Sequence, residues 1–518
     1  MKKFNTTGTC YPNKHYMVDI SNQVNKAVDL IKDNTYFCIN RGRQFGKTTT
    51  INVLKKELEN QGYAVFSLSF EGLDESNFET VDNVCATFLR IMNIQITRNK
   101  VTNISQKSID FLSEYQNITT YDSIKLQNLV YQLCADNPNV VVIIDEVDQA
   151  SNSDSFVKFL GFFRSLYLKR DEDPTFQSII LAGVYDVKNL KLKMRPNEEH
   201  QYNSPWNIAV SFKADMSLPV VGIAKMLNEY KLDTNQDFDE NYIAQIIHDW
   251  TSGYPYLVSR ICQLIDTEKY GWNNDGIIEA VKYILNDRDD LLFKDMMKKI
   301  SDFPKLRQIL YSMLYAGNLI GYNPNEPNLD LGFMFNFLKN VNRKVEVFCR
   351  LFETRIYNLF IEQENLSELY CQGGRDKNSF IKDGDLDVKR IMEKFAIHFH
   401  DIYGEKNERF VEAEGRKFFM LYLRPIINGI GNYYVESQTR DYTRTDIIID
   451  YKSKQYIIEL KIWNGEEYNR KGEIQLSEYL DYYHLNEGYM LSFCFNKNKT
   501  IGPKTVEINN KILHEVIV

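Results

Sequence analysis

The chain has 518 residues, 43% of them hydrophobic and 25% charged, and its formal net charge is −8. This composition excludes an intrinsically disordered chain and a uniformly basic nucleic-acid-binding sleeve, although a local basic groove is compatible with an acidic protein. The length is sufficient for roughly two to four domains.

The eight cysteines are scattered, without a C-x-x-C pair or a histidine spacing suited to zinc. We therefore expect reduced thiols in a cytoplasmic protein. The N-terminal segment has two lysines but no apolar signal region, and no uninterrupted apolar run in the chain reaches bilayer length. We expect neither secretion nor a membrane span.

The first part of the chain predicts alternating strands and helices. Near-continuous apolar runs are typical of strands that are buried on both faces of a parallel sheet. Such runs occupy residues 36–40, 63–70, 139–148 and 176–184. The helical pattern after the first run ends at Gly62, a favourable residue for stopping a helix. These features predict an α/β fold.

The pattern becomes helical from about residue 214 and stays mostly helical beyond residue 285. The charged stretch IKDGDLD, residues 381–387, predicts a linker, and an α+β pattern follows it. We therefore predict four parts, with boundaries at 1–213, 214–285, 286–384 and 385–518.

The stretch RGRQFGKTTT, residues 41–50, lies between the first predicted strand and a helix. It nearly satisfies the phosphate-loop pattern G-x-x-x-x-G-K-[ST], but the first glycine falls one residue late. Gly46 would let the backbone approach the phosphates, Lys47 would reach the β and γ phosphates, and Thr48 would offer its hydroxyl to Mg²⁺. The alternative is a turn with a helix-start lysine. The predicted nucleotide-binding residues are Arg41, Gly42, Arg43, Gln44, Phe45, Gly46, Lys47, Thr48, Thr49 and Asp145.

Two acids end the third predicted strand, in the sequence VVVIIDEVD. Asp145 would hold Mg²⁺ through water, and Glu146 would orient and deprotonate the attacking water. Such a pair is by itself often only the polar start of a loop, but the phosphate loop weakens that interpretation. The strand at 176–184 would lie beside it as a sensor strand, with Tyr185 or Asp186 near the γ-phosphate.

These segments, together with HYMVDI, ILAGVYDVKNLKLKMRP, YNSPWNIA and TSGYPYLVSRICQLID, resemble the AAA-like ATPase domain related to archaeal-type and STAND ATPases, over about the first 280 residues. The resemblance implies that residues 15–20 lie near the adenine and that Gly253 and Pro255 of a helical lid close over the nucleotide. An arginine finger is implied only for an oligomer. Arg164, Arg170 and Arg195 are the candidates, and a surface arginine is the alternative for each.

The stretch TDIIIDYKSKQYIIELKIW, residues 445–463, predicts two strands around a polar turn, KSKQ. Asp446 opens the first strand, while Glu459 and Lys461 alternate with apolar neighbours and share one face of the second. An unpaired buried carboxylate costs on the order of several kcal/mol, so such groups are paired or bind metal. Asp446, Glu459 and the carbonyl of Leu460 could hold Mg²⁺, and Lys461 could position or deprotonate water. The alternative is an ion pair at a sheet edge.

This arrangement resembles the PD-(D/E)XK nuclease superfamily over about residues 385–518. The resemblance implies a preceding helix in which Glu414, preferred over Glu412, is a further metal ligand. It also implies a first strand in GNYYVESQTR, a second helix whose Gln475 faces the site, and a following strand in GYMLSFCFN. Thr445 stands where the motif has proline.

Weaker signals have ordinary alternatives. His398 and His400 are two residues apart in a predicted helix and are interpreted as ordinary helix residues. A cluster of basic residues could contact phosphates, with a solvated face as the equal alternative. It comprises Arg440, Arg444, Lys452, Lys454 and Arg470.

The sequence thus predicts an α/β P-loop NTPase sheet with a helical lid, a helical connector and a C-terminal α/β restriction-endonuclease-like domain. We expect an enzyme that binds and hydrolyses ATP and whose Mg²⁺-dependent nuclease cuts nucleic acid, with DNA as the expected substrate, under ATP control. ATP and Mg²⁺ are the expected cofactors, no membrane partner is expected, and a homo-oligomer stays open. The alternative is a nucleotide-controlled signalling or scaffold ATPase whose C-terminal domain binds nucleic acid or a partner without cutting. A role in bacterial defence is consistent with such a fusion but has no direct support in the sequence.

Overall fold

The computed structural model describes most of the chain in two compact units. The described residues are 2–115, 117–150, 153–184, 206–315, 320–323, 326–363, 373, 377–382, 385–403, 412–427, 431–434, 447–451, 454–463, 465–494 and 502–518. The first unit comprises Met1–Ala244, Gly253–Gln263 and Met334–Asn336, and the second comprises Gln245–Ser252, Leu264–Phe333 and Phe337–Val518. The predicted four-part division stays a prediction.

A parallel five-stranded sheet forms the centre of the first unit, which confirms the predicted α/β class. Its strand order is β2-β3-β4-β1-β5, so that β4 separates the strand before the phosphate loop from the strand that ends in acids. The strands are β1 (Phe37–Asn40), β2 (Ala64–Ser69), β3 (Val140–Asp145), β4 (Ser178–Gly183) and β5 (Val210–Ser211). The expectation that β4 lies beside β3 is confirmed by their pairing.

Strand β3 is shorter than the sequence pattern predicted. It ends at Asp145, and a short 3-10 helix, Val147–Ala150, follows it. The apolar pattern continues through Val147 because this residue is also buried, but Glu146 has a positive φ of 55° and breaks the extended backbone. The apolar residues at the end of this run therefore indicate buried positions, and they do not show where the strand ends.

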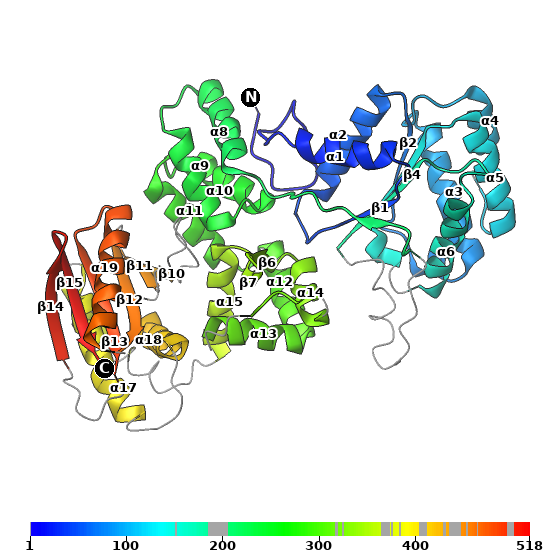
Figure 1. The fold of residues 1–518 in the computed structure, drawn as a ribbon. Coiled ribbons are helices and arrows are strands. Elements are labelled where there is room, and N and C mark those ends of the chain that lie inside the picture. The colour runs from blue at the N-terminus through cyan, green and yellow to red at the C-terminus, as the bar shows by residue number, and fades with distance from the viewer. Residues whose placement is uncertain are drawn as a thin grey trace. The chain divides into compact units, whose positions relative to one another are not determined.

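Helices cover both faces of this sheet because its strands are apolar on both sides. Figure 1 shows α1 and α2 on one side and α3, α5 and α6 on the other. Side-chain oxygens of Thr80, Ser105, Asp122 and Ser153 cap the N-termini of α3 to α6. The helices are α1 (Ser21–Lys32), α2 (Lys47–Asn60), α3 (Val81–Thr97), α4 (Gln106–Ser113), α5 (Ser123–Asp136) and α6 (Asp154–Leu168).

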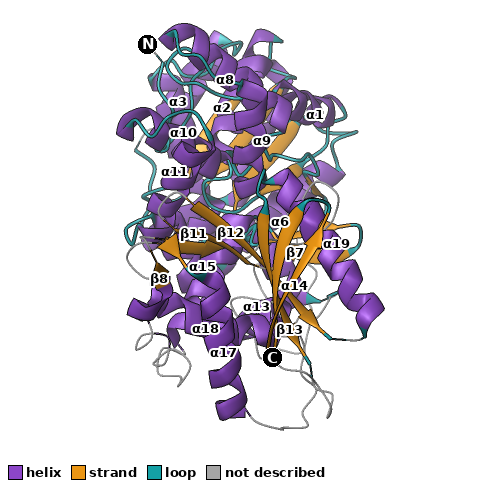
Figure 2. Ribbon diagram, turned by 90° about the vertical axis from the view of Figure 1, so that its left-hand side faces the viewer, coloured by secondary structure: helices purple, strands orange, loops and turns teal. Residues whose placement is uncertain are grey.

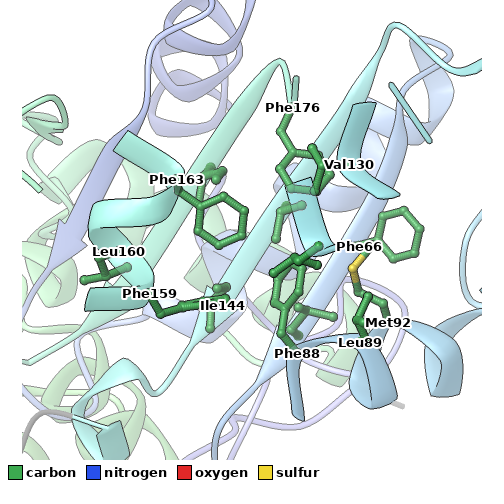
Figure 3. Close-up of a cluster of buried hydrophobic side chains, with 14 of the residues drawn as sticks. Phe66, Phe88, Leu89, Met92, Val130, Ile144, Phe159, Leu160, Phe163 and Phe176 are labelled. Atoms are coloured by element: carbon green, nitrogen blue, oxygen red, sulfur yellow. The ribbon is translucent and has the colours of Figure 1, made fainter. Parts of the chain in front are cut away.

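Aromatic side chains dominate the core between the sheet and helices α3, α5 and α6. Figure 3 shows Phe66 and Ile144 of the sheet facing Phe88 of α3 and Phe159 and Phe163 of α6. The rings of Phe159 and Phe163 meet edge to face at 4.8 Å, an arrangement that contributes beyond the burial of apolar area. This core fixes the end of β3, and therefore Asp145, relative to the phosphate loop.

The predicted helices from residue 214 onward are present. They are α8 (Val220–Thr234), α9 (Glu240–Thr251), α10 (Pro255–Glu268), α11 (Asn274–Asn286), α12 (Leu291–Asp302), α13 (Pro304–Tyr315), α14 (Pro327–Met334) and α15 (Arg350–Gln363). The hairpin of β6 (Leu338–Val341) and β7 (Lys344–Val347) was not predicted. Its turn residues Asn342 and Arg343 both have positive φ, which the sequence Asn-Arg does not signal as Asn-Gly would.

A six-stranded mixed sheet forms the C-terminal part of the second unit, in the order β10-β11-β12-β13-β15-β14. Neighbours are antiparallel from β10 to β12 and parallel from β12 to β13 and on to β15. The elements are α17 (Val388–Tyr403), α18 (Glu412–Ile427), β10 (Gly431–Tyr434), β11 (Ile447–Tyr451), β12 (Lys454–Ile462), α19 (Glu466–Tyr482), β13 (Glu487–Phe493), β14 (Gly502–Ile508) and β15 (Lys511–Ile517).

The two faces of this sheet carry different helices. Phe493 of β13 packs against Phe395 of α17, and a side chain at Gly415 of α18 would overlap the Phe493 ring. Met490 points to the opposite face, where it and Lys461 lie against Gly472 of α19. Figure 2 shows the sheet between these helices.

The C-terminal elements follow the predicted order of helix, strand, hairpin, helix and strand. The hairpin strands extend further toward their turn than predicted, because Asp450 pairs with Gln455 and Tyr451 with Lys454 in the ladder. Main-chain hydrogen bonds do not require apolar side chains. The prediction assigned the polar residues Lys454 and Gln455 to the turn, whereas they belong to the strand. In the stretch predicted as a linker, Ile381–Lys382 and Asp385–Leu386 pair as short strands. No helix in the described part of the chain is long and apolar enough to span a membrane.

Candidate functional site

The phosphate loop has the backbone needed to turn directly from β1 into α2. Gln44 and Gly46 have φ angles of 56° and 85°, and α2 begins at Lys47. Glycine adopts this left-handed backbone without steric cost, which accounts for Gly46. The first N–H groups of α2 have no partner within the helix, so the start of α2 is suited to hold an anion.

Lys47 is buried and folds over its own loop. Its Nζ donates to the carbonyl oxygens of Arg41 at 3.0 Å and Gly42 at 3.1 Å. These hydrogen bonds hold the ammonium group at the mouth of the loop without burying an unpaired charge. The lysine is therefore already positioned beside the loop that would hold the phosphates.

Thr48 and Asp145, which were both predicted to lie near Mg²⁺, are in contact although they are 97 residues apart. Thr48 Oγ1 donates to Asp145 Oδ2 at 2.9 Å, and the backbone N–H of Glu146 donates to Asp145 Oδ1 at 2.9 Å. Burial raises the pKa of Asp145, and the hydrogen bonds from Thr48 and Glu146 oppose that effect. The hydroxyl and the carboxylate thus place two hard oxygen atoms side by side at the start of α2.

Glu146 follows directly, half-buried and in the left-handed region with a φ of 55°. Burial raises the pKa of Glu146, and the neighbouring charge of Asp145 raises it further. A carboxyl group whose pKa is raised is a better proton acceptor when ionised than an exposed one. The strained backbone and the altered pKa coincide at the residue predicted to be the base.

The departure from the phosphate-loop pattern has a structural explanation. The guanidinium of Arg41 donates to the carbonyl oxygens of Asn40, Phe212 and Ala214, at 2.8, 3.1 and 2.8 Å. Arg41 thus ties the loop to the chain that follows β5. At position 42, a side chain would overlap the carbonyl oxygen of Phe335, so glycine is needed there instead.

The segment predicted to be the lid lies against the loop. Tyr254 Oη donates to the carbonyl oxygen of Arg43, and its ring meets Phe45 edge to face at 4.8 Å. The Cγ of Pro255 is 3.9 Å from the position that a Cβ on Gly46 would occupy. Tyr254 was not predicted as a site residue, although it lies inside the motif that suggested the lid.

Residues before α1 also reach this region. The backbone N–H of Cys10 donates to Thr49 Oγ1 at 3.1 Å, and Tyr16 Oη donates to Asp233 of α8 at 3.0 Å. Burial lowers the pKa of His15, which accepts a hydrogen bond at Nδ1 from the N–H of Tyr11 at 3.0 Å. The predicted proximity of residues 15–20 to the adenine stays a prediction.

The donor set at the end of β3 fits Mg²⁺. Magnesium prefers a few carboxylate or hydroxyl oxygens together with phosphate oxygens and water. Thr48 and Asp145 supply such oxygens 2.9 Å apart, and Asp145 is only 7% exposed. These two residues are the ones that would hold the ion.

The other residues suggested for this site have mixed outcomes. Tyr185, Asp186 and Arg195 lie outside the described residues. Arg170 donates to the carbonyl of Tyr167 at 2.9 Å and stacks over the ring of the same residue, which is a local structural role. Arg164 lies on α6, and its role as an arginine finger stays untested.

The C-terminal site is described in part. Glu459 is fully buried, and its Oε1 is 2.9 Å from Lys461 Nζ. The register places Glu459 beside Met490 and Lys461 beside Ser492, on the face covered by α19. The two residues therefore share a face, as their alternation predicted, and they lie in the sheet interior and not at an exposed edge.

The remaining residues of this predicted site are not brought together by the described structure. Asp446 lies outside the described residues, and the side chain of Glu414 on α18 is not described. The side chain of Leu460 is buried on the opposite face of β12, and the proposed role of its carbonyl oxygen as a metal ligand stays a prediction. Gln475 on α19 donates to Tyr479 Oη at 2.8 Å, one turn further along its own helix.

Sequence reasoning missed a buried polar cluster beside Lys461. Ser492 Oγ donates to Glu515 Oε1 at 2.8 Å and also contacts Asn469 Oδ1 at 3.3 Å. Lys504 Nζ lies 3.6 Å from Glu473 and 3.9 Å from Glu515. The one sequence feature that could have predicted this cluster is the alternation of polar and apolar residues in β13 and β15. Among the described residues, no group of three His, Cys, Asp or Glu side chains is placed to hold a metal ion.

Comparison with known proteins identifies the N-terminal half. A family model described as an AAA-like domain matches residues 10–286, more than half of the chain. No curated protein is similar enough to match.

Several solved structures are similar at low identity. A Walker-type ATPase of Pyrococcus abyssi is 14% identical, with a TM-score of 0.47, over 68% of this chain and 99% of its own. The ORC2 protein of Aeropyrum pernix, in ADPNP and ADP complexes, is 13% identical with a TM-score of 0.36, over 67% and 94%. AMPPCP-bound DnaA from Aquifex aeolicus is 13% identical with a TM-score of 0.30, over 68% and 91%. Because these TM-scores are low, the family assignment comes from the family model alone.

Proposed function

The chain belongs to the family of proteins with an AAA-like domain, and on that premise we propose that it binds ATP at the loop of residues 41–49 and hydrolyses it. The observation that carries this proposal is the hydrogen bond of 2.9 Å between Thr48 and Asp145, which joins the loop to the acidic strand end. Both parts of an ATPase site, the phosphate cradle and the acids, therefore meet at one place.

Each residue has a defined part in the reaction. The N–H groups at the start of α2 and the ammonium of Lys47 bind the β and γ phosphates, and Thr48 and Asp145 hold the metal. When bound, Mg²⁺ neutralises charge on the phosphate oxygens. Glu146 orients the attacking water and accepts its proton, which its raised pKa favours.

Two variants test this assignment separately. Lys47→Ala is expected to abolish binding of a fluorescent ATP analogue, because it removes the cation at the loop. Glu146→Gln is expected to bind the analogue normally but to lower the turnover of ATP by about 10²- to 10⁴-fold, since only the proton acceptor is lost. Normal turnover in Glu146→Gln would contradict the role of this residue.

We further propose that the C-terminal part is a Mg²⁺-dependent nuclease of the PD-(D/E)XK type, that it cuts DNA, and that ATP controls it. The proposal is supported by the buried pair of Glu459 and Lys461, 2.9 Å apart on one face of β12. The order α18, β10, β11, β12, α19, β13, with β13 parallel to β12, is also the order expected of such a domain. On this proposal, Asp446 and Glu414 complete the metal site and Gln475 faces it.

The nuclease test must allow for the buried charges. Removing Lys461 alone takes away the cation that lies 2.9 Å from a buried carboxylate, and breaking a buried pair in this way costs about 3–5 kcal/mol of stability. The double variant Glu459→Gln/Lys461→Met removes both charges together, and Asp446→Ala removes a ligand outside this pair. Each is expected to lower Mg²⁺-dependent DNA cleavage by at least about 100-fold at unchanged thermal stability.

The control for this test is Lys294→Ala. Lys294 belongs to the second unit but lies outside the C-terminal sheet, and it forms an exposed pair with Asp289 at 2.7 Å. Exposed pairs contribute at most about 1 kcal/mol, so this variant should cleave as well as the unmodified chain. Cleavage at the unmodified rate by both the double variant and Asp446→Ala would contradict the proposed nuclease site.

The second candidate is a nucleotide-controlled scaffold whose C-terminal part docks nucleic acid or a partner without cutting. In that case the buried pair of Glu459 and Lys461, 2.9 Å apart, only stabilises the sheet. Titration of the full chain with Mn²⁺ separates the two proposals. A nuclease requires binding that Asp446→Ala abolishes, while a scaffold requires none.

A further inference from the structure

A short segment far along the chain lies against the phosphate loop. Residues Met334–Asn336 comprise the last residue of α14 and the first part of the link to β6. They belong to the first unit, although the chain before Met334 and after Asn336 belongs to the second. Asn336 is half-buried and has a φ of 57°, a left-handed backbone that asparagine tolerates better than most residues. Phe335 is almost fully buried, so the segment is anchored.

The contact falls on the residue where the loop departs from its pattern. The backbone N–H of Gly42 donates to Asn336 Oδ1 at 2.5 Å, across a separation of 294 residues. A side chain at position 42 would overlap the carbonyl oxygen of Phe335. Position 42 requires glycine because the backbone of Phe335 and the side chain of Asn336 fill the space that a side chain would need.

Both backbone polar groups of Gly42 are thereby engaged. Its N–H binds Asn336, and its carbonyl oxygen accepts a hydrogen bond of 3.1 Å from Lys47 Nζ. Gly42 thus links Asn336 to Lys47, the lysine that would reach the phosphates. A loop that is fixed before the nucleotide arrives does not pay its ordering entropy at binding.

We propose that Asn336 is a positioning residue of the nucleotide site, and that through Gly42 it couples nucleotide binding to the order of the segment 334–336. Asn336 holds the first turn of the loop in the conformation that Lys47 requires. Coupling between two sites is reciprocal, so a bound nucleotide must stabilise the contact of Asn336 by as much as that contact favours the nucleotide. The proposal rests on the proposed ATP site.

The first test compares two asparagines with the same backbone conformation. Asn336→Gly removes the acceptor without adding backbone strain, and Asn342→Gly makes the same change in the turn between β6 and β7, where φ is 51°. Loss of one hydrogen bond is expected to weaken binding of a fluorescent ATP analogue about five- to tenfold in Asn336→Gly. Asn342→Gly is expected to bind like the unmodified chain.

The second test measures the coupling itself. In the unmodified chain, a saturating ATP analogue is expected to slow amide hydrogen exchange in the peptide that contains Phe335–Leu338, and in Asn336→Gly this protection should be lost. Gly42→Ala displaces the same contact, so its effect on affinity should not add to that of Asn336→Gly in the double variant.

The outcomes separate failure of this inference from failure of the ATP site. If Lys47→Ala abolishes binding while Asn336→Gly binds normally or more tightly, Asn336 does not position the loop. Additive effects of Gly42→Ala and Asn336→Gly would also overturn the coupling. If Lys47→Ala binds normally, the proposed nucleotide site itself is wrong.

Discussion

At the scale of single residues, the nucleotide site contains groups that lower the stability of the fold when no ligand is bound. Asp145 is 7% exposed at the end of an apolar strand, and Glu146 beside it has a strained backbone. Two neighbouring carboxylates in a buried place repel one another, and burial penalises their charged forms. Such a pair is expected where function, and not stability, selects the residues.

This cost predicts that Asp145→Asn stabilises the chain in the absence of Mg²⁺ and nucleotide. Burial raises the pKa of Asp145 in the folded state, so the folded protein binds more protons than the unfolded chain between the two pKa values. Stability therefore falls as pH rises through that window, and the loss persists at neutral pH. Thermal unfolding at pH 7 should show a midpoint higher by about 2–4 °C in Asp145→Asn.

A surface aspartate provides the control. Asp136→Asn removes an ion pair with Lys107 at 2.9 Å, and it should leave the midpoint unchanged or lower it slightly. A lower midpoint for Asp145→Asn than for the unmodified chain would show that the ionised carboxylate stabilises the fold.

At the scale of elements, sequence patterns predicted the parts that depend on local chemistry. Apolar runs predicted β1 to β4. The loop motif and the acidic strand end each predicted a residue near Mg²⁺, Thr48 and Asp145, and the structure joins these two by a hydrogen bond. The hairpin of β6 and β7 was missed because its strands of four residues each carry little apolar signal. Asn336 was missed because its contact spans 294 residues and a single asparagine forms no pattern.

The turn before α10 permits a test at this scale. Gly253 has a φ of 72°, and a side chain there would overlap the backbone of Leu218, whose N–H donates to the Gly253 carbonyl at 2.8 Å. Gly62 has a φ of 88° with open space around it. Gly62→Ala is expected to cost only the backbone strain, about 1 kcal/mol, and Gly253→Ala clearly more, in urea unfolding.

Gly253→Ala should also weaken nucleotide binding, because the turn places Tyr254 and Pro255 against the loop. Equal costs for the two glycine variants would indicate that the contact with Leu218 is not required for the fold of this turn.

At the scale of the whole molecule, the chain combines an AAA-like ATPase with a C-terminal sheet that carries a buried acid and lysine pair. ATP can control cleavage only to the extent that it binds the cutting state more tightly than the resting state. Tenfold control needs about 1.4 kcal/mol of such a difference. Along the chain, Asn336 of the first unit is followed directly by Phe337 of the second.

The central claim, an ATP-controlled nuclease, is tested most directly by one cleavage assay on the full chain. Single- and double-stranded DNA and RNA are incubated with Mg²⁺ alone, with Mg²⁺ and ATP, and with Mg²⁺ and a non-hydrolysable analogue. We predict cleavage of DNA whose rate changes at least about tenfold between Mg²⁺ alone and Mg²⁺ with ATP, and loss of that change in Lys47→Ala. No cleavage of any nucleic acid under all three conditions would contradict the account and leave a nucleotide-controlled scaffold.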